Sequence, residues 1–239
     1  MDPRHVALHW SGGKDSALAL SLLLAREDVV VDRLLTTVHP ELGASTVHEL
    51  PTALVHAQAR SIGLPLHTVD LPGPGLEGYV ETMDAAAADL RSQGIRACAF
   101  GDLDVSGARA FHEEQFGPWG IEVLEPLEGM TSSESLTRFL AAGFVATTVV
   151  VDAAVLGVEH LGVTLDTAFL DALPPGVDPA GEFGEYHSFV HDGPIFRVPV
   201  AFVPGGHRCV EHDIGTTAGV RRHRYRLATP GTPPEDSAP

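Results

Sequence analysis

Residues 6–16 form the sequence Val-Ala-Leu-His-Trp-Ser-Gly-Gly-Lys-Asp-Ser, and a helix-favouring run follows at residues 17–25. An apolar strand that enters a helix through a glycine pair is where parallel α/β proteins bind phosphate, because free backbone N–H groups and the positive end of the helix dipole face the turn. Glycines let an anion approach the main chain, serine hydroxyls donate hydrogen bonds, and lysine supplies a positive charge. The candidate phosphate-binding residues are Ser11, Gly12, Gly13, Lys14, Asp15 and Ser16.

This turn differs from the common Walker nucleotide loop. The Walker pattern needs a glycine five positions before its Gly-Lys pair and a Ser or Thr directly after the lysine. Ala7 and His9 flank the first of these positions, and Asp15 occupies the second. A carboxylate beside phosphate is repelled unless Mg²⁺ lies between them or the side chain caps the helix. The pattern disfavours a kinase or GTPase that transfers a γ-phosphate, and a solvated glycine turn is the structural alternative.

Composition and charge limit the classes of protein that fit. A chain of 239 residues with 44% hydrophobic residues is long enough to bury a large core. Its formal net charge of −17 argues against strong electrostatic binding of nucleic acid, because such binding requires a clustered cationic surface. The two cysteines, Cys98 and Cys209, are too few for a disulfide framework or a four-cysteine metal site.

The sequence predicts a cytoplasmic protein without a membrane partner. The first strand is expected within a few residues of Met1, which leaves no room for a signal sequence. The longest apolar run, at residues 149–158, is interrupted by Asp152, so no segment is expected to span a membrane.

Strand and helix patterns alternate as far as Val151. The predicted strands are residues 6–10, 29–38, 64–69, 97–100, 121–124 and 144–151, and the predicted helices are residues 15–26, 51–62, 78–93, 107–116 and 133–142. Repeated strand–helix units indicate an α/β fold with a doubly wound parallel sheet. Ligands bind at the carboxyl ends of such strands, where Thr37, His39 and the pair Gly101-Asp102 fall.

The regular alternation of strand and helix patterns ends at Asp152, which predicts a second part of mixed α+β structure. The predicted parts are a nucleotide-binding domain at residues 1–151, a C-terminal acceptor-substrate domain at residues 152–227, and a disordered tail at residues 228–239. Basic and other residues alternate at residues 221–226, which suits an exposed edge strand.

Residues 181–190, Gly-Glu-Phe-Gly-Glu-Tyr-His-Ser-Phe-Val, concentrate polar groups late in the chain. Two carboxylates, a phenol, an imidazole and a hydroxyl are costly to bury without partners, so they either face water or line a site. On a strand, Glu185 and His187 would share one face and could act on one substrate as acid, base or ammonia binder. A β-hairpin whose polar side chains simply face water is the structural alternative.

Histidines are frequent in the last quarter of the chain, which raises the possibility of a zinc site. The candidates are His187, His191, His207 and His212. They lack the paired spacing and the cysteine ligands of the common zinc motifs, so hydrogen-bonded or surface histidines are the favoured interpretation.

The turn at residues 11–16 resembles the Ser-Gly-Gly-x-Asp-Ser loop of N-type ATP pyrophosphatases, which cleave ATP between its α- and β-phosphates. More narrowly, the chain resembles the ATP-binding family of diphthine-ammonia ligase, which amidates a carboxylate on a translation elongation factor with ATP and ammonium. The matching segments occur in family order: residues 11–16, Val47-His48, Gln58-Ala59, residues 63–66, Phe100-Gly101-Asp102-Leu103, residues 143–146, residues 161–166 and residues 181–194.

The resemblance implies roles for the matching residues. Residues 11–16 would bind the phosphates of ATP, Asp15 and Asp102 would lie near Mg²⁺, and the strand end with Thr37 and His39 would meet adenine. His48 and Gln58 would lie on the segment that borders the nucleotide, and Gly101 would be a further nucleotide-binding residue. The implied catalytic residues are Lys14, Asp102, Glu182, Glu185 and His187. Residues 181–190, called the late motif below, would bind a carboxylate acceptor, whose acyl-adenylate is then attacked by ammonium or another amine.

The late motif departs from the family pattern. Relatives carry Glu-Tyr-Glu-Thr where this chain has Glu185-Tyr186-His187-Ser188, and the exchange of a carboxylate for a mostly neutral imidazole changes the local charge. Ala180 and Glu128 also depart from the family pattern, whereas these departures do not affect the nucleotide-binding half. ATP use is therefore better supported than diphthine as the acceptor. The alternatives are a tRNA-modifying ATP pyrophosphatase and a non-catalytic adenine-nucleotide-binding protein, and a homodimer is left open.

Overall fold

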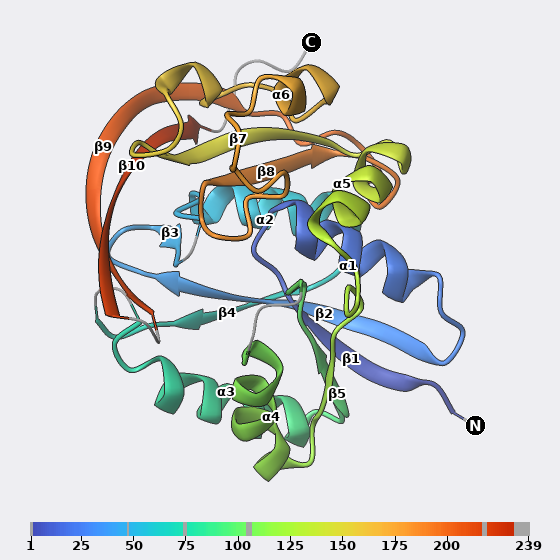
Figure 1. Ribbon diagram of the computed structural model, residues 1–239. Coiled ribbons are helices and arrows are strands. Elements are labelled where there is room, and N and C mark those ends of the chain that lie inside the picture. Colours follow the sequence, from blue (N-terminus) through green and yellow to red (C-terminus); the bar gives the residue numbers. More distant parts are fainter. Residues whose placement is uncertain (1, 47, 74–75, 104–106, 217–218, 232–239) are drawn as a thin grey trace, which may run out of the picture.

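The computed structural model describes residues 2–46, 48–73, 76–103, 107–216 and 219–231. Six strands form the first sheet: β1 (Arg4–His9), β2 (Val29–His39), β3 (Ala44–Ser45), β4 (Leu66–Asp70), β5 (Ala97–Ala99) and β6 (Glu122–Leu124). Five of them are parallel in the order β4-β2-β1-β5-β6, and the short β3 pairs antiparallel with the end of β2. The predicted α/β fold with a parallel sheet is confirmed (Figure 1).

Helices cover both faces of this sheet. On one face lie α1 (Lys14–Leu24), α2 (Thr52–Ile62) and α5 (Ser132–Ala141), and on the other lie α3 (Tyr79–Ser92), α4 (Ala108–Phe116) and the short 3₁₀ helix η1 (Gly117–Trp119). Because side chains alternate along a strand, Val6 and Leu8 of β1 join the core with α1 and α2, whereas Ala7 joins the core with α3. Within the described ranges, no helix has the length and hydrophobicity that a membrane span requires.

A second, antiparallel sheet follows in the chain. Its strands are β7 (Val145–Asp152), β8 (Tyr186–Asp192), β9 (Val203–Thr216) and β10 (Gly219–Gly231), in the order β8-β7-β10-β9. The 3₁₀ helix η2 (Val158–His160) and the helix α6 (Thr167–Asp171) lie in the connection between β7 and β8. In Figure 1, α1 and α2 lie between the two sheets. One apolar core includes residues of both parts, such as Leu8, Leu54 and Phe189.

The structure corrects three details of the prediction. The strand expected at residues 144–151 pairs with β8 and β10 and therefore belongs to the second sheet. The first strand of the second sheet thus begins at Val145, and not after Asp152 as expected. Residues 221–226 do not form an edge: β10 lies between β7 and β9 in the sheet order. An alternating basic pattern indicates one exposed face, which interior strands of a sheet also have.

The third correction concerns the predicted tail. β10 continues to Gly231, so residues 228–231 belong to a strand, where Ala228 pairs with His207 of β9. Residues 232–239 lie outside the described residues. The division of the chain into two domains stays a prediction.

A buried glutamine holds the second sheet against the turn that follows β1. Gln58 on α2 is 0% exposed. Its Nε2 donates to the carbonyl oxygens of Gly12, at 2.9 Å, and Val190, at 2.7 Å, and its Oε1 accepts from Trp10 Nε1 at 3.0 Å. The N–H of Val190 also donates to the Gly12 carbonyl oxygen at 3.0 Å. Strand β8 is therefore bound directly to the glycine turn.

We expect Gln58→Ala to lower the free energy of unfolding by about 2–4 kcal/mol, because it leaves buried polar groups without a partner and opens a cavity. Urea denaturation followed by circular dichroism measures the change. His56 lies on the exposed side of the same helix, so His56→Ala is the matched control, with an expected change within about 0.5 kcal/mol. Equal losses in the two variants would contradict this role of Gln58.

Candidate functional site

The turn between β1 and α1 leads directly into the helix. Gly13 is the N-cap residue of α1, and no side chain caps the helix there. The first N–H groups of a helix lack partners within it, so they are available to other groups. One of them, the N–H of Lys14, donates to Ser188 Oγ of β8 at 3.1 Å. The late motif therefore already contacts the start of the helix.

Close contacts explain the glycine and serine positions of this turn. Gly12 has a φ of +81°, and a Cβ at this position would lie 2.7 Å from Gln58 Oε1, so both the conformation and the space require glycine. The hydroxyl oxygen atoms of Ser11 and Ser16 are 3.1 Å apart, and Ser16 Oγ donates to the Gly13 carbonyl oxygen at 3.0 Å. The predicted phosphate-binding residues thus form one compact turn.

Lys14, the only lysine in the sequence, lies between two carboxylates. Its Nζ is 2.6 Å from Asp15 Oδ2 and 3.4 Å from Glu182 Oε1, and the side chain of Lys14 is 7% exposed. The ring centroid of Tyr186 lies 5.9 Å from the same Nζ, within the range of a cation–π contact. The structure therefore brings together Lys14 and Glu182, which are 168 residues apart in the chain.

Burial sets the charge states of this cluster. Burial alone would lower the pKa of Lys14, but the Asp15 and Glu182 carboxylates more than offset it, so the pKa is raised and the ammonium group stays charged. Burial raises the pKa of Asp15, and it raises the pKa of Glu182 to about 7. Removal of a carboxylate from water disfavours its charged form. Glu182 is therefore poised to gain or lose a proton near neutral pH.

Two histidines stack beside the turn. The ring centroids of His48 and His187 are 4.6 Å apart, with an angle of 27° between the ring planes. A Cβ on Gly13 would lie 2.4 Å from His48 Cε1, so the ring rests directly on the turn. Burial, with a smaller contribution from Lys14, lowers the pKa of His187 to about 4, and burial lowers that of His48 well below its usual value. Both rings are therefore neutral at pH 7.

Glu185 contacts the backbone of its own loop. Its Oε1 accepts from the N–H of Asp178 at 3.1 Å, and its Oε2 accepts from the N–H of Phe183 at 3.0 Å. These bonds close the loop that presents Glu182. Glu185 and His187 thus have different neighbours, although the strand pattern predicted a shared face: β8 begins at Tyr186, and Glu185 precedes it.

Gly101 and Asp102 lie at the carboxyl end of β5 next to the same turn. A Cβ on Gly101 would lie 2.9 Å from the backbone nitrogen of Ser16. The charge of Asp102 contributes to the raised pKa of Asp15, after burial, so the two carboxylates lie at one edge of the sheet. Asp102 Oδ2 is 2.8 Å from His112 Nε2 of α4. No sequence pattern predicted this partner, because Asp102 follows β5 whereas His112 lies on α4.

Thr37 and His39 lie buried at the end of β2, as predicted. Thr37 Oγ1 is 2.7 Å from Thr46 Oγ1, and His39 pairs with Ala44 of β3. The short strand β3 therefore borders the strand end that was expected to meet adenine. Contact with adenine stays a prediction.

No group of three or more His, Cys, Asp or Glu side chains with a geometry suited to a metal ion occurs in the part of the chain that the structure describes. The side chains of His207 and His212 on β9 lie outside that part. Cys98 is buried in β5, and burial raises the pKa of its thiol, so this residue packs in the core as an unreactive thiol.

We expect Glu182 to titrate near neutral pH. Its pKa rises from the usual 4.5 to about 7 in the folded protein, so its contribution to stability is greatest below the unfolded-state pKa and is lost as the pH rises through about 7. Glu182→Gln should therefore flatten the dependence of unfolding free energy on pH between about pH 5 and pH 8. Urea denaturation at several pH values measures this, with the exposed Glu114→Gln as control. Parallel curves for wild type and Glu182→Gln would contradict the assignment.

Two known protein-domain families match most of the chain. Residues 4–115 match the family described as the diphthamide synthase N-terminal domain, and residues 132–217 match the diphthamide synthase C-terminal domain. No curated protein matches the chain. Among solved structures, the U34-tRNA thiolase NcsA from Methanococcus maripaludis with its 4Fe-4S cluster is similar at 16% sequence identity and a TM-score of 0.38, over 59% of this chain and 57% of that chain. This chain thus aligns with little more than half of the thiolase. The two family matches together span most of the sequence, and the chain belongs to the diphthamide synthase family.

Proposed function

We propose that this protein is an AMP-forming amide ligase, in which ATP activates a carboxylate acceptor and ammonium or another amine then displaces AMP. Membership of the diphthamide synthase family supports an ATP-utilising enzyme. The observation behind the finer proposal is the direct contact of the glycine turn with the late motif, through Lys14 to Glu182 and Ser188. A reaction at the α-phosphate needs the nucleotide-binding turn and the acceptor-binding segment side by side.

The proposed reaction has two steps. A carboxylate oxygen of the acceptor forms a bond to the α-phosphorus, the bond to the oxygen that bridges to the β-phosphate breaks, and pyrophosphate leaves. Ammonium, or a protonated amine, first loses a proton to solvent, which frees the lone pair of the nitrogen. The nitrogen then forms a bond to the acyl carbon, the bond from this carbon to the adenylate oxygen breaks, AMP leaves, and the nitrogen loses a second proton. Both steps depend on positioning and charge neutralisation more than on a protein nucleophile.

The residues of the cluster fit these needs. Lys14 is charged beside its two carboxylate partners, and it would exchange them for phosphate oxygens, which are also anionic and would keep the ammonium group charged. The neutral ring of His187 can accept or donate a hydrogen bond at the acceptor side without adding charge. Glu185, which organises the loop of Glu182, would act by positioning that loop.

The carboxylates at the sheet edge fit a role near Mg²⁺. Asp15 Oδ1 is buried and has no hydrogen-bond partner among the described residues, and Asp102 lies near enough to affect the pKa of Asp15. Mg²⁺ in nucleotide enzymes is held by one or two carboxylates together with phosphate oxygens. When bound there, the ion would neutralise phosphate charge.

Product analysis tests the proposed function. The protein is incubated with ATP, Mg²⁺, ammonium chloride and a panel of peptides that carry exposed carboxylates, and the nucleotides are resolved by ³¹P NMR. We expect AMP and pyrophosphate in place of ADP and phosphate. Lys14→Met should weaken ATP binding in calorimetry by at least about tenfold, the loss expected for one charge-assisted contact.

The control for this variant removes a positive charge elsewhere. Arg26 is 39% exposed and pairs with Asp28, so Arg26→Met should leave ATP binding unchanged. Formation of ADP would rule out cleavage between the α- and β-phosphates. Tight ATP binding without any turnover on the panel would favour the non-catalytic alternative.

A further inference from the structure

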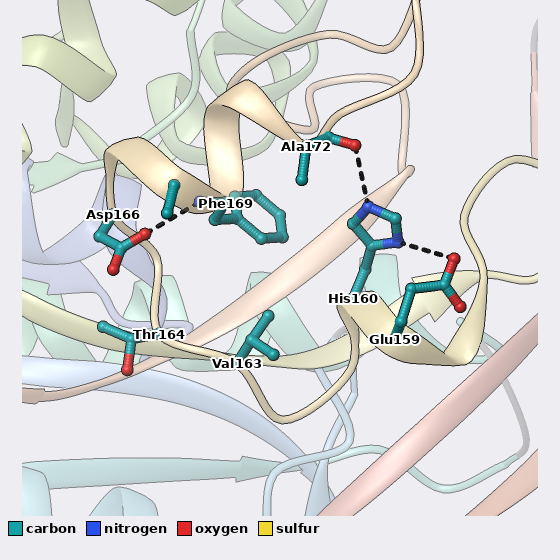
Figure 2. A pocket seen from close by; sticks show the side chains of 8 residues that line it. Glu159, His160, Val163, Thr164, Asp166, Phe169 and Ala172 are labelled. Carbon is teal, nitrogen blue, oxygen red and sulfur yellow. Dashed lines mark hydrogen bonds and ion pairs between the residues drawn. The ribbon is translucent and has the colours of Figure 1, made fainter.

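A cavity of about 690 Å³ lies beside η2 and α6 in the second half of the chain (Figure 2). Its wall includes Glu159, His160, Val163, Asp166 and Phe169. None of the residues that line it belongs to the site around Lys14. The cavity is thus a second candidate binding site, with a different set of side chains from the site around Lys14.

His160 presents a buried acceptor to this cavity. The residue is 8% exposed, and its Nε2 lies 3.3 Å from the carbonyl oxygen of Ala172. Because a carbonyl oxygen only accepts, Nε2 is the donor in this pair, and in the tautomer with its proton on Nε2 the Nδ1 atom is an acceptor. Nδ1 is buried and has no hydrogen-bond partner among the described residues. Figure 2 shows the ring beside the cavity, with Nδ1 turned toward Glu159.

The second group at this end of the cavity also only accepts when it is charged. Glu159 Oε1 is 3.6 Å from His160 Nδ1, which is too long for a hydrogen bond. The two atoms are thus within ion-pair distance and share no hydrogen bond, and the Glu159 side chain is exposed whereas Nδ1 is buried. A buried acceptor such as Nδ1 is normally satisfied by a donor from a ligand, from water or from another chain segment.

The rest of the wall selects the kind of donor. Among the side chains that the structure describes, no lysine or arginine lines the cavity, and a second carboxylate, Asp166, lies across it from Glu159 in Figure 2. Phe169 and Val163 form an apolar surface between the two carboxylates. A ligand with a positively charged, donor-rich end and a short alkyl chain matches this arrangement, since a primary ammonium group has three N–H donors and no acceptor.

We propose that this cavity binds an aliphatic primary amine. The ammonium group donates to His160 Nδ1 and to the Glu159 carboxylate, and the alkyl chain packs on Phe169 and Val163. A diamine of suitable length places its second ammonium group at Asp166 and binds more tightly than a monoamine. This binding requires neither nucleotide nor Lys14, so it stands independently of the proposed ligase reaction.

Calorimetric titrations without nucleotide test the proposal. The ligands are butylamine, diaminobutane, butanol as the uncharged control, and a blocked lysine amide to represent the side chain of a protein partner. We expect butylamine to bind at least about fivefold more tightly than butanol, because charge-assisted hydrogen bonds are stronger than hydrogen bonds between neutral groups. Tighter binding of diaminobutane than of the lysine amide indicates a free diamine, and the reverse order indicates a protein lysine; both orders support an amine site.

Variants locate the binding. Glu159 has an exposed side chain and can be changed without loss of core packing, so Glu159→Gln should weaken butylamine about fivefold, while the exposed Glu114→Gln on α4 should have no effect. Asp166→Asn keeps a side chain that can cap α6, and it should weaken diaminobutane but not butylamine. Lys14→Met should retain amine binding. Equal affinities for butylamine and butanol, or equal effects of Glu159→Gln and Glu114→Gln, would overturn the proposal.

Discussion

The contact between strand β8 and the glycine turn after β1 is the constraint on which the site depends. Gln58 binds the backbone on both sides of this contact, and the N–H of Val190 adds a further bond to Gly12. All of these groups are buried, so separation of the turn from β8 would expose several unpaired polar groups at once. The late motif is therefore fixed against the glycine turn, and Glu182 and Ser188 contact Lys14 of the adjoining helix.

Local patterns predicted the parts of the fold that depend on neighbouring residues. The strand, glycine pair and helix of residues 6–25 are visible in the sequence, because apolar period and glycine position are local properties. The partner sheet of β7 depends on pairing with β8 and β10, which no local pattern reveals. Glu182 and Glu185 are the same residue type three positions apart, and only the loop geometry assigns one to Lys14 and the other to the loop backbone.

The balance of charges around Lys14 limits how a phosphate could bind there. One ammonium group serves two carboxylates, and the adjacent histidines are neutral, so the cluster without ligand has no surplus positive charge. A triphosphate that enters must displace carboxylates from Lys14 or bring a cation with it. In the proposed function, displacement of the carboxylates or a cation beside them would make an aspartate directly after the lysine compatible with phosphate binding.

The presence of a single lysine allows a direct measurement of the central claim, that Lys14 binds the phosphates of ATP. Protein labelled with ¹³C at the lysine ε-carbon gives one side-chain signal, which can be followed as ligand is added. The account predicts that ATP with Mg²⁺ and pyrophosphate with Mg²⁺ both shift this signal to saturation, whereas adenosine leaves it in place. A signal that does not move at saturating ATP would contradict the account.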